Sequence, residues 1–165
     1  MVGCPGRTVP GVSDPDWNRD VDADLDALRE FGTSVLVTLM ESHELPRYTI
    51  AAEDLAREVR ARGMEWLHLP IIDMAAPDER FERLWDEGAG AALREHLHQG
   101  RTVVIHCLAG LGRTGTIAAR LLVELGTHPN DAIGDVRAAR RHTIQTPEQE
   151  WYVRACKAPR EPPTA

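Results

Sequence analysis

The segment from His106 to Thr114 holds the residues of this chain whose types and spacing could do chemistry. It reads His-Cys-Leu-Ala-Gly-Leu-Gly-Arg-Thr, with Arg113 six positions after Cys107. A cysteine that is already ionised is a strong nucleophile and needs no general base. A guanidinium can hold two oxygens of a phosphate with its planar fork, which a lysine ammonium cannot do. These residue types indicate attack of the Cys107 sulfur on a phosphate ester that Arg113 holds.

The glycines of this segment suit a loop that binds phosphate through its backbone. A loop that leads into a helix N-terminus can turn several N–H groups inward, and the helix dipole adds positive potential. Gly110 and Gly112 permit positive φ and close backbone approach. The same potential favours the Cys107 thiolate. The predicted substrate-binding residues are Leu108, Ala109, Gly110, Leu111, Gly112 and Arg113.

Thr114 and His106 are expected to support the reaction. The Thr114 hydroxyl could donate to the sulfur when a phosphocysteine bond breaks, so we count it with the catalytic residues. His106 is expected to hold the loop through backbone hydrogen bonds rather than to act as a base. A plain alternative for Cys107 is a buried apolar cysteine after a strand, but the accompanying His, Gly, Arg and Thr favour catalysis.

Helices and strands alternate along the chain and must position this loop. Apolar residues at helical spacing are repeatedly followed by a glycine and a short apolar run. The predicted strands cover residues 34–39, 65–69 and 101–106. The predicted helices cover residues 19–31, 51–62, 78–100, 114–125, 132–141 and 146–157. Gly88 and Gly90 are expected to interrupt the third of these helices, and Thr146 with Gln149 predicts a capping box at the start of the last. This alternation predicts an α/β fold whose central, largely parallel, twisted sheet of four to five strands is flanked by helices.

The loop resembles the signature loop of the cysteine-dependent protein tyrosine and dual-specificity phosphatases. The similarity is greatest to the kinase-associated phosphatase branch, described as cyclin-dependent-kinase inhibitor-like, and extends from about Asp22 to Val153. It is carried by the segments 106–114, 69–78 and 144–149. The resemblance implies a protein tyrosine phosphatase-like fold and a general acid at Asp73, 34 residues before Cys107. It also implies that Gln145 places the hydrolytic water.

Two alternatives remain for the acid. Asp78 is a rival carboxylate, although its place just before Glu79 suits a helix N-cap better. Asp73 could also be a plain turn-forming aspartate. Under the preferred interpretation, Asp73 lies on a loop that swings over the phosphate, excludes water and carries the acid to the leaving oxygen.

Charge and cysteine content exclude several classes of partner and cofactor. The 19 basic and 26 acidic residues give a net charge of −7, so no domain-wide basic field is available for nucleic acid or for an anionic membrane surface. Cys4, Cys107 and Cys156 are too few and too scattered for a disulfide framework or a zinc site. We expect reduced thiols, no metal and no cofactor, and leave open whether Cys4 or Cys156 can pair with Cys107.

The length of 165 residues predicts one domain, with residues 1–15 as a loosely ordered arm and 159–165 as a tail. No run approaches the ~20 apolar residues of a membrane span and the start lacks the pattern of a secretory signal, so we expect a cytoplasmic protein. The 18 arginines against one lysine fit a GC-rich bacterial genome. Oligomeric state is not predicted.

The leading hypothesis is a phosphatase acting on phosphotyrosine, with phosphoserine and phosphothreonine as further candidates, in phosphorylated protein partners. One alternative is a phosphoinositide or other small-molecule phosphatase that uses the same loop. A substrate with several phosphates would favour more cations than this loop holds. Another is an inactive module that binds phosphoresidues.

Overall fold

The sheet of this protein has three strands, all of them parallel. In the computed structural model, which describes residues 1–9 and 17–158, β1 (Thr33–Thr38) lies between β2 (Glu65–His68) and β3 (Thr102–His106). The expectation of four to five strands is therefore wrong for the described residues. The chain has three apolar runs that are suited to strands, and these form the sheet. The isolated bridge of Val2 with His106 extends the sheet by one residue without forming a strand.

The predicted helices are present, with ends that differ from the expected ones by at most three residues, whereas the short helix Leu45–Tyr48 was not predicted. Asp78 accepts a hydrogen bond from the N–H of Phe81 at 3.0 Å and caps its helix, and Thr146 and Gln149 form a capping box. The interruption expected at Gly88 and Gly90 in the helix 78–100 is confirmed: a π-helical turn covers Trp85–Ala89, and Gly88 has φ 138°. The α-helices of the described residues are α1 (Val21–Glu30), α2 (Leu45–Tyr48), α3 (Ala52–Ala61), α4 (Glu79–Leu84), α5 (Gly90–His98), α6 (Gly112–Glu124), α7 (Pro129–Ala139) and α8 (Pro147–Ala155).

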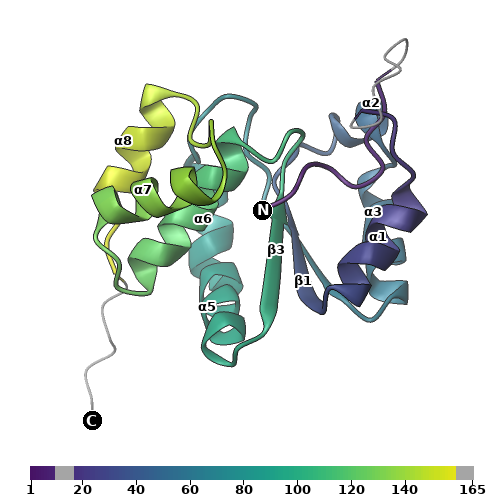
Figure 1. Cartoon of the computed structure of the whole chain (residues 1–165), viewed down its shortest axis with the longest axis horizontal. Helices are drawn as coiled ribbons and strands as arrows, with labels where there is room; N and C mark the ends of the chain where they lie inside the picture. The colour runs from purple at the N-terminus through teal and green to yellow at the C-terminus, as the bar shows by residue number, and fades with distance from the viewer. Residues whose placement is uncertain (10–16, 159–165) are drawn as a thin grey trace.

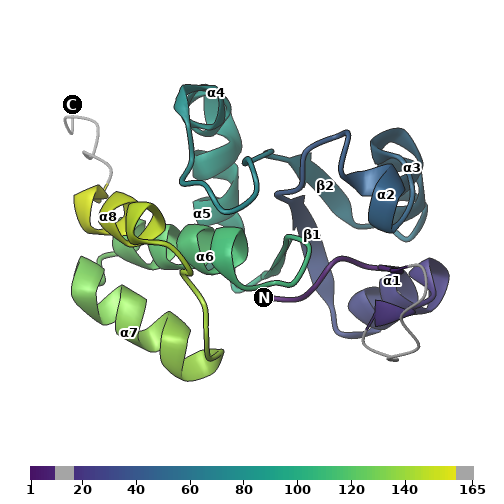
Figure 2. The ribbon, with the colours of Figure 1, turned by 90° about the horizontal axis from the view of Figure 1, so that it is seen from above.

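Helices cover both faces of the sheet (Figures 1 and 2). Successive side chains of β1 point to opposite faces. Val35 and Val37 pack in one core with α4, α5 and α6, and Leu36 packs in the other with α1 and α3. The helices α7 and α8 pack against α6 around a third apolar cluster and form an outer layer. The expected layered α/β architecture is confirmed.

The carboxyl ends of the three strands meet at one edge of the sheet. From β1 the chain enters the segment Leu39–Glu44, from β2 it enters Leu69–Asp78, and from β3 it enters Cys107–Leu111. Backbone hydrogen bonds hold the loops together where they leave the sheet: Ile71 N–H donates to the carbonyl of Leu39 at 3.0 Å. In open parallel sheets, ligands bind at this edge. The fold thus gathers three loops from distant parts of the sequence.

The first nine residues have defined contacts, which differs from the expected loose arm. Cys4 is 1% exposed and belongs to the core beside α1 and α3. The N–H of Val2 donates to the carbonyl of Ile105, and the N–H of Cys4 donates to that of Leu108. This segment is ordered because it covers the edge of β3 and the loop that follows it. The remainder of the expected arm and the tail lie outside the described residues.

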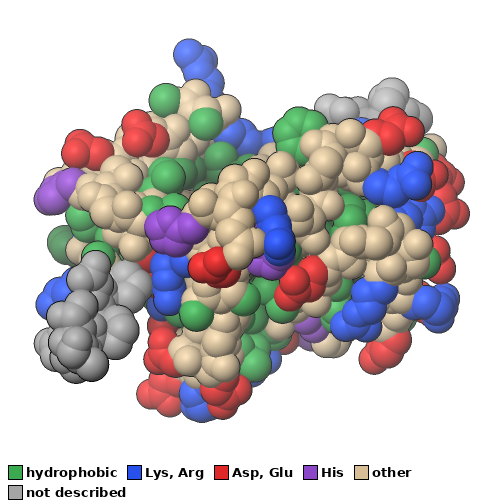
Figure 3. All heavy atoms as spheres, turned by 90° about the horizontal axis from the view of Figure 1, so that it is seen from below, with side chains coloured by type: hydrophobic (Ala, Val, Ile, Leu, Met, Phe, Trp, Pro, Cys, Tyr) green, Lys and Arg blue, Asp and Glu red, His purple; other side chains and the backbone are tan. Residues whose placement is uncertain are grey.

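Charged side chains of both signs are interspersed on the face at the amino ends of the strands, and neither sign forms one large patch there (Figure 3). Of the described helices, none is long and apolar enough to cross a membrane.

Candidate active site

The loop Cys107–Leu111 lines a small cavity at the carboxyl edge of the sheet. The cavity has a volume of about 180 Å³. Three separate segments contribute to its wall, which consists of Asp73, Met74, Cys107, Leu108, Ala109, Gly112, Arg113, Gln145 and Gln149. The structure thus brings together the predicted nucleophile, phosphate ligand, acid and water-placing residue. Four other predicted residues, His106, Gly110, Leu111 and Thr114, lie beside the cavity without lining it.

The backbone of this loop offers donors that the protein leaves unused. Within the described part of the chain, no group accepts a hydrogen bond from the N–H groups of residues 108–111. The N–H groups of Gly112–Thr114 form the first turn of α6 and have no partner one turn earlier. The first bond within this region runs from Gly115 N–H to the carbonyl of Leu111 at 2.8 Å. Such a loop at a helix N-terminus can bind an anion.

Arg113 is held rigidly although its side chain is only 1% exposed. Its Nη1 donates to Oε2 of Glu44 at 2.7 Å and to the carbonyl of Ile71 at 3.1 Å, and its Nη2 lies 3.3 Å from Oε1 of Glu44. Burial by itself would lower the pKa of Arg113, but its hydrogen bonds to Glu44 and the negative charge of the neighbouring Cys107 and Asp73 raise the pKa above its ordinary value. The guanidinium is therefore charged at all relevant pH values.

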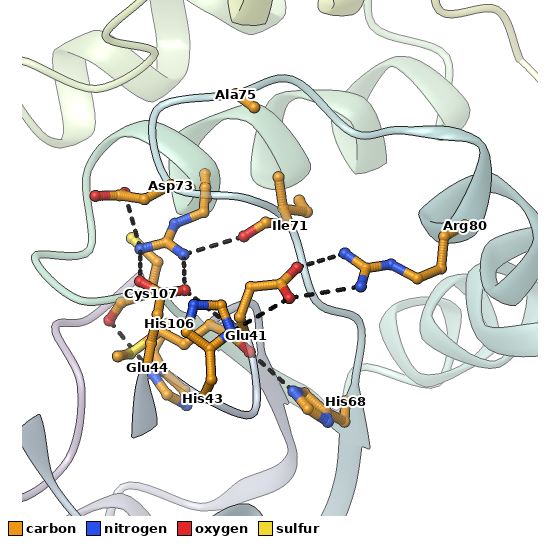
Figure 4. Close-up of polar contacts among 12 residues, drawn as sticks. Glu41, His43, Glu44, His68, Ile71, Asp73, Ala75, Arg80, His106 and Cys107 are labelled. Carbon is orange, nitrogen blue, oxygen red and sulfur yellow. Dashed lines mark hydrogen bonds and ion pairs between the residues drawn. The ribbon is translucent and has the colours of Figure 1, made fainter. Parts of the chain in front are cut away.

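Asp73 also contacts this arginine. Its Oδ1 lies 2.9 Å from Nη2 of Arg113, and its side chain is 58% exposed. Figure 4 shows the Asp73 carboxylate near Cys107. The Glu44 carboxylate and the Ile71 carbonyl contact the same guanidinium. The neighbouring Met74 has φ 61°, a conformation that is unusual for a residue with a side chain. The acid loop thus places its carboxylate directly at the cavity.

Two buried polar atoms next to the cavity have no partner among the described residues, namely Nε of Arg113 and Oγ1 of Thr114. Thr114 is fully buried at the start of α6. Buried polar groups are usually hydrogen-bonded, so unpartnered ones at a cavity indicate groups that a ligand satisfies.

His106 contacts Thr38 and the backbone of Cys107, at the start of the loop. Its Nε2 lies 2.7 Å from Oγ1 of Thr38, its Nδ1 lies 3.4 Å from the carbonyl of Cys107, and Trp66 donates to the same Thr38 oxygen at 2.9 Å. Because the Thr38 oxygen accepts from Trp66, its own hydrogen can go to Nε2, which leaves Nδ1 protonated toward Cys107. Burial lowers the pKa of His106 to about 4, so the ring is neutral. This geometry agrees with the expected supporting position.

Gln145 and Gln149 close the cavity from the side of α8. The N–H of Gln145 donates to Oε1 of Gln149 at 2.8 Å, and Nε2 of Gln149 donates to the carbonyl of Ala75 at 3.1 Å. A Cβ at Gly112 would lie 2.7 Å from Oε1 of Gln145 and 3.1 Å from the Gln149 amide. A side chain at position 112 would therefore move both glutamine amides away from the start of α6.

The two other cysteines have different surroundings. Burial raises the pKa of Cys4 to about 12, with a smaller contribution from nearby Cys107, and burial raises that of Cys156 to about 11. The Cys156 thiol donates to the carbonyl of Tyr152 on its own helix. Neither cysteine lines the cavity, and the structure contains no disulfide among the described residues.

Comparison with known proteins identifies this arrangement. The model of the family described as "Polymorphic toxin system, DSP-PTPase phosphatase" matches residues 10–127, which include Asp73, Cys107 and Arg113. The chain belongs to this family. It is accordingly a member of the cysteine-dependent protein tyrosine and dual-specificity phosphatase superfamily, as the resemblance of the loop predicted.

Individual DSP-PTPase relatives agree with this assignment. Cyclin-dependent kinase inhibitor 3 of Rattus norvegicus is 30% identical over 148 residues, which cover 88% of this chain and 67% of the relative. A probable protein tyrosine phosphatase type IVA B of Dictyostelium discoideum is 40% identical over 86 residues, 52% of this chain and 53% of the relative. The chain thus spans between about half and two thirds of the length of these relatives.

The fold of this family member is also that of solved phosphatases. A crystal structure of kinase associated phosphatase, with its catalytic-site cysteine replaced by serine, superposes with a TM-score of 0.78 at 28% identity, covering 92% of this chain and 80% of the other. Tk-PTP in its active form superposes with a TM-score of 0.66 at 32% identity, covering 80% and 82%.

Glu44 and Gln149 are the cavity neighbours that the sequence reasoning missed in this DSP-PTPase. Glu44 follows the buried strand β1, and its signal was an acidic residue at the carboxyl end of a parallel strand, the edge where strand ends converge. Gln149 was expected only as part of the Thr146 capping box. Its side chain is fully buried and also bonds the acid loop at Ala75.

Proposed function

We propose that this DSP-PTPase family member is an active protein phosphatase that hydrolyses phosphotyrosine through a phosphocysteine intermediate. Phosphoserine and phosphothreonine in proteins are further candidate substrates. Cys107 is the nucleophile, Arg113 and the loop 108–112 bind the phosphate, and Asp73 is the general acid and base.

In the first step, the Cys107 thiolate attacks the phosphorus, a sulfur–phosphorus bond forms and the bond to the leaving oxygen breaks. Asp73 in its protonated form gives its proton to that oxygen, which leaves as a phenol or alcohol. In the second step, Asp73 takes a proton from water as the water attacks phosphorus, and the sulfur–phosphorus bond breaks. Thr114 donates to the departing sulfur, and Gln145 orients the water. The products are the dephosphorylated residue and inorganic phosphate.

The observation that carries this proposal is the set of unused donors around Cys107. The free N–H groups of residues 108–111 and the buried guanidinium of Arg113 surround a cavity of about 180 Å³, whose wall includes the cysteine. Preorganised donors of this kind stabilise negative charge that develops on phosphate oxygens. The two unpartnered buried atoms, Nε of Arg113 and Oγ1 of Thr114, support the same interpretation.

The rim of the cavity supports a protein substrate. Ile72 and Met74, on either side of Asp73, are 57% and 51% exposed, and Trp151 is 71% exposed in the groove that also contains Gln145. Exposed apolar side chains around a polar site are typical of surfaces that contact proteins. Within the loop, Leu108, Ala109 and Leu111 carry no charge that would pair with the further phosphates of an inositol ring.

Hydrolysis by the Cys107→Ser variant tests the nucleophile. We expect loss of phosphotyrosyl hydrolysis with an unchanged thermal melting curve, whereas the matched Cys156→Ser variant keeps its activity because Cys156 does not line the cavity. Normal turnover by Cys107→Ser would refute the proposal.

Substrate class is tested with phosphotyrosyl, phosphothreonyl and phosphoinositide substrates, each with and without a chelator. Faster hydrolysis of the phosphoinositide than of every phosphopeptide would refute the protein substrate. Loss of hydrolysis on chelation would contradict the mechanism described above.

A further inference from the structure

The carbonyl oxygens of Leu108 and Ala109 are each bound by an arginine from a distant part of the chain. Nη1 of Arg7, in the N-terminal segment, donates to the Leu108 carbonyl at 3.2 Å. Nη2 of Arg140, which follows α7, donates to the Ala109 carbonyl at 3.1 Å. Both arginines line a second cavity of about 350 Å³, which shares no lining residue with the cavity at Cys107. The loop is therefore held from the side opposite to its candidate ligand.

These contacts determine where two backbone donors point. A peptide unit is planar and trans, so the C=O of one residue and the N–H of the next point in opposite directions; the described residues contain no cis peptide bond. With the Leu108 carbonyl turned toward Arg7, the N–H of Ala109 points the other way. With the Ala109 carbonyl turned toward Arg140, the N–H of Gly110 does the same. Both N–H groups are among those without an acceptor in the described chain.

The N-terminal segment reinforces this orientation. The N–H of Cys4 donates to the same Leu108 carbonyl at 3.0 Å, so that oxygen has two donors. Gly110 has φ 72°, and a Cβ there would lie 2.2 Å from the carbonyl oxygen of Val2. Hydrogen bonds with a charged donor are stronger than neutral ones and polarise the peptide that accepts them. The two guanidinium charges also favour an anion on the inner side of the loop.

We infer that Arg7 and Arg140 are positioning residues that hold the 108–110 peptides with their N–H groups facing the phosphate. Neither arginine touches the substrate; each acts through the peptide that it binds. The inference rests on the proposed function, because it assigns these residues to the binding of the phosphate that Cys107 attacks. The N-terminal segment is then a part of the active site rather than an appendage.

Binding of tungstate, an unreactive tetrahedral dianion, tests this inference by calorimetry on the full chain. We expect Arg140→Met to bind tungstate about tenfold more weakly, the effect of losing one charged hydrogen bond. Arg7→Met should have a similar effect, and the double variant should lose about a hundredfold, because the two arginines orient different peptides. In steady-state hydrolysis, the KM should rise together with a fall in kcat/KM.

Arg141→Met is the matched control. Arg141 is exposed, follows Arg140 directly, and has no polar contact within the described chain, so this variant removes the same charge without releasing the loop. Arg140→Lys keeps a cation that can donate to the Ala109 carbonyl and should retain most of the affinity. If Arg140→Met does not fold, the tungstate affinities of Arg140→Lys and Arg7→Met test the inference.

Wild-type affinity in a folded Arg140→Met protein, or an equal loss in Arg141→Met, would overturn the inference and leave the proposed function intact. A folded Arg140→Lys that loses as much affinity as expected for Arg140→Met would also overturn it. A wild-type chain that neither binds tungstate nor hydrolyses phosphotyrosine would overturn both.

Discussion

Asp73 and Arg113 form an ion pair across the candidate active site, with Oδ1 of the carboxylate 2.9 Å from Nη2 of the guanidinium. The two partners differ in solvent exposure: the Asp73 side chain is 58% exposed and that of Arg113 is 1% exposed. The carboxylate occupies a donor that a phosphate would use. Under the proposed function, a bound dianion displaces Asp73 from Arg113, and the exposed acid loop then carries the carboxylate to the leaving oxygen.

The first prediction concerns Asp73→Asn. Removing this negative charge should strengthen tungstate binding by about tenfold, since a competing charge at contact distance is lost. Hydrolysis of a phosphotyrosyl peptide should slow by roughly 10² to 10⁴, the usual contribution of a general acid. Hydrolysis of an activated ester such as 4-nitrophenyl phosphate should slow much less, because its leaving group needs no proton. Calorimetry and leaving-group kinetics provide the measurements.

Asp78→Asn is the control for this prediction, because Asp78 is the rival carboxylate on the same loop. It caps α4 through the N–H of Phe81, and asparagine caps helices nearly as well. We expect little change in stability and in leaving-group dependence. Suppose that the Asp73 variant hydrolyses all esters more slowly by the same factor, whereas the rate of the Asp78 variant depends on the leaving group. The roles of acid and helix cap must then be exchanged between the two residues.

The second prediction is that Glu44→Gln lowers the free energy of unfolding by about 2 kcal/mol, the range for a buried hydrogen bond to a charged group. Arg113 would lose its charged partner in a nearly water-free position. Glu41→Gln, which loses the pair with the 43% exposed side chain of Arg80, should change stability much less, because exposed pairs contribute little. Urea unfolding of both variants tests the difference. Equal effects would show that burial of Arg113 does not depend on Glu44.

The third prediction concerns acid stability. Burial lowers the pKa of His106 from its ordinary 6.5 to about 4. Between these values the unfolded chain takes up a proton that the folded chain does not, so protonation favours unfolding. The contribution to stability is complete above pH 6.5 and declines toward pH 4, by about 3 kcal/mol in total.

Urea unfolding as a function of pH, in the wild type and in His106→Asn, measures this contribution. The variant should be less stable at neutral pH and should have a flatter dependence between pH 6.5 and 4. An identical slope in the two proteins would mean that other groups cause the acid destabilisation.

The fourth prediction compares two glycines with nearly the same backbone. Gly110 has φ 72° and Gly100 has φ 69°, but a Cβ at Gly110 meets the Val2 carbonyl at 2.2 Å while a Cβ at Gly100 meets nothing within 4 Å. Gly100→Ala should lower stability by about 1 kcal/mol from backbone strain alone. Gly110→Ala should lower it further and weaken tungstate binding. If both variants behave alike in calorimetry and thermal melting, Val2 does not fix this loop.

Local signals were sufficient for most helices and for the loop at Cys107, but they missed the short helix α2. The caps at Asp78 and Thr146 depend on residues three positions away, and the His-Cys-to-Arg-Thr segment is contiguous. The number of strands was predicted incorrectly, because strand pairing is a relationship between distant segments. Val2 forms a single bridge with His106, and among the described residues no further strand joins the sheet.

By itself, the sequence determined which chemistry the chain could perform, because nucleophile, guanidinium and flexible glycines lie within nine consecutive residues, 106–114. The tertiary structure alone decided what surrounds them. Glu44 is 69 positions from the arginine it holds, Gln149 is 74 positions from Ala75, and Arg7 is 101 positions from Leu108. Such contacts arise only when the parallel strands bring their carboxyl ends to one edge, and no spacing along the chain encodes them.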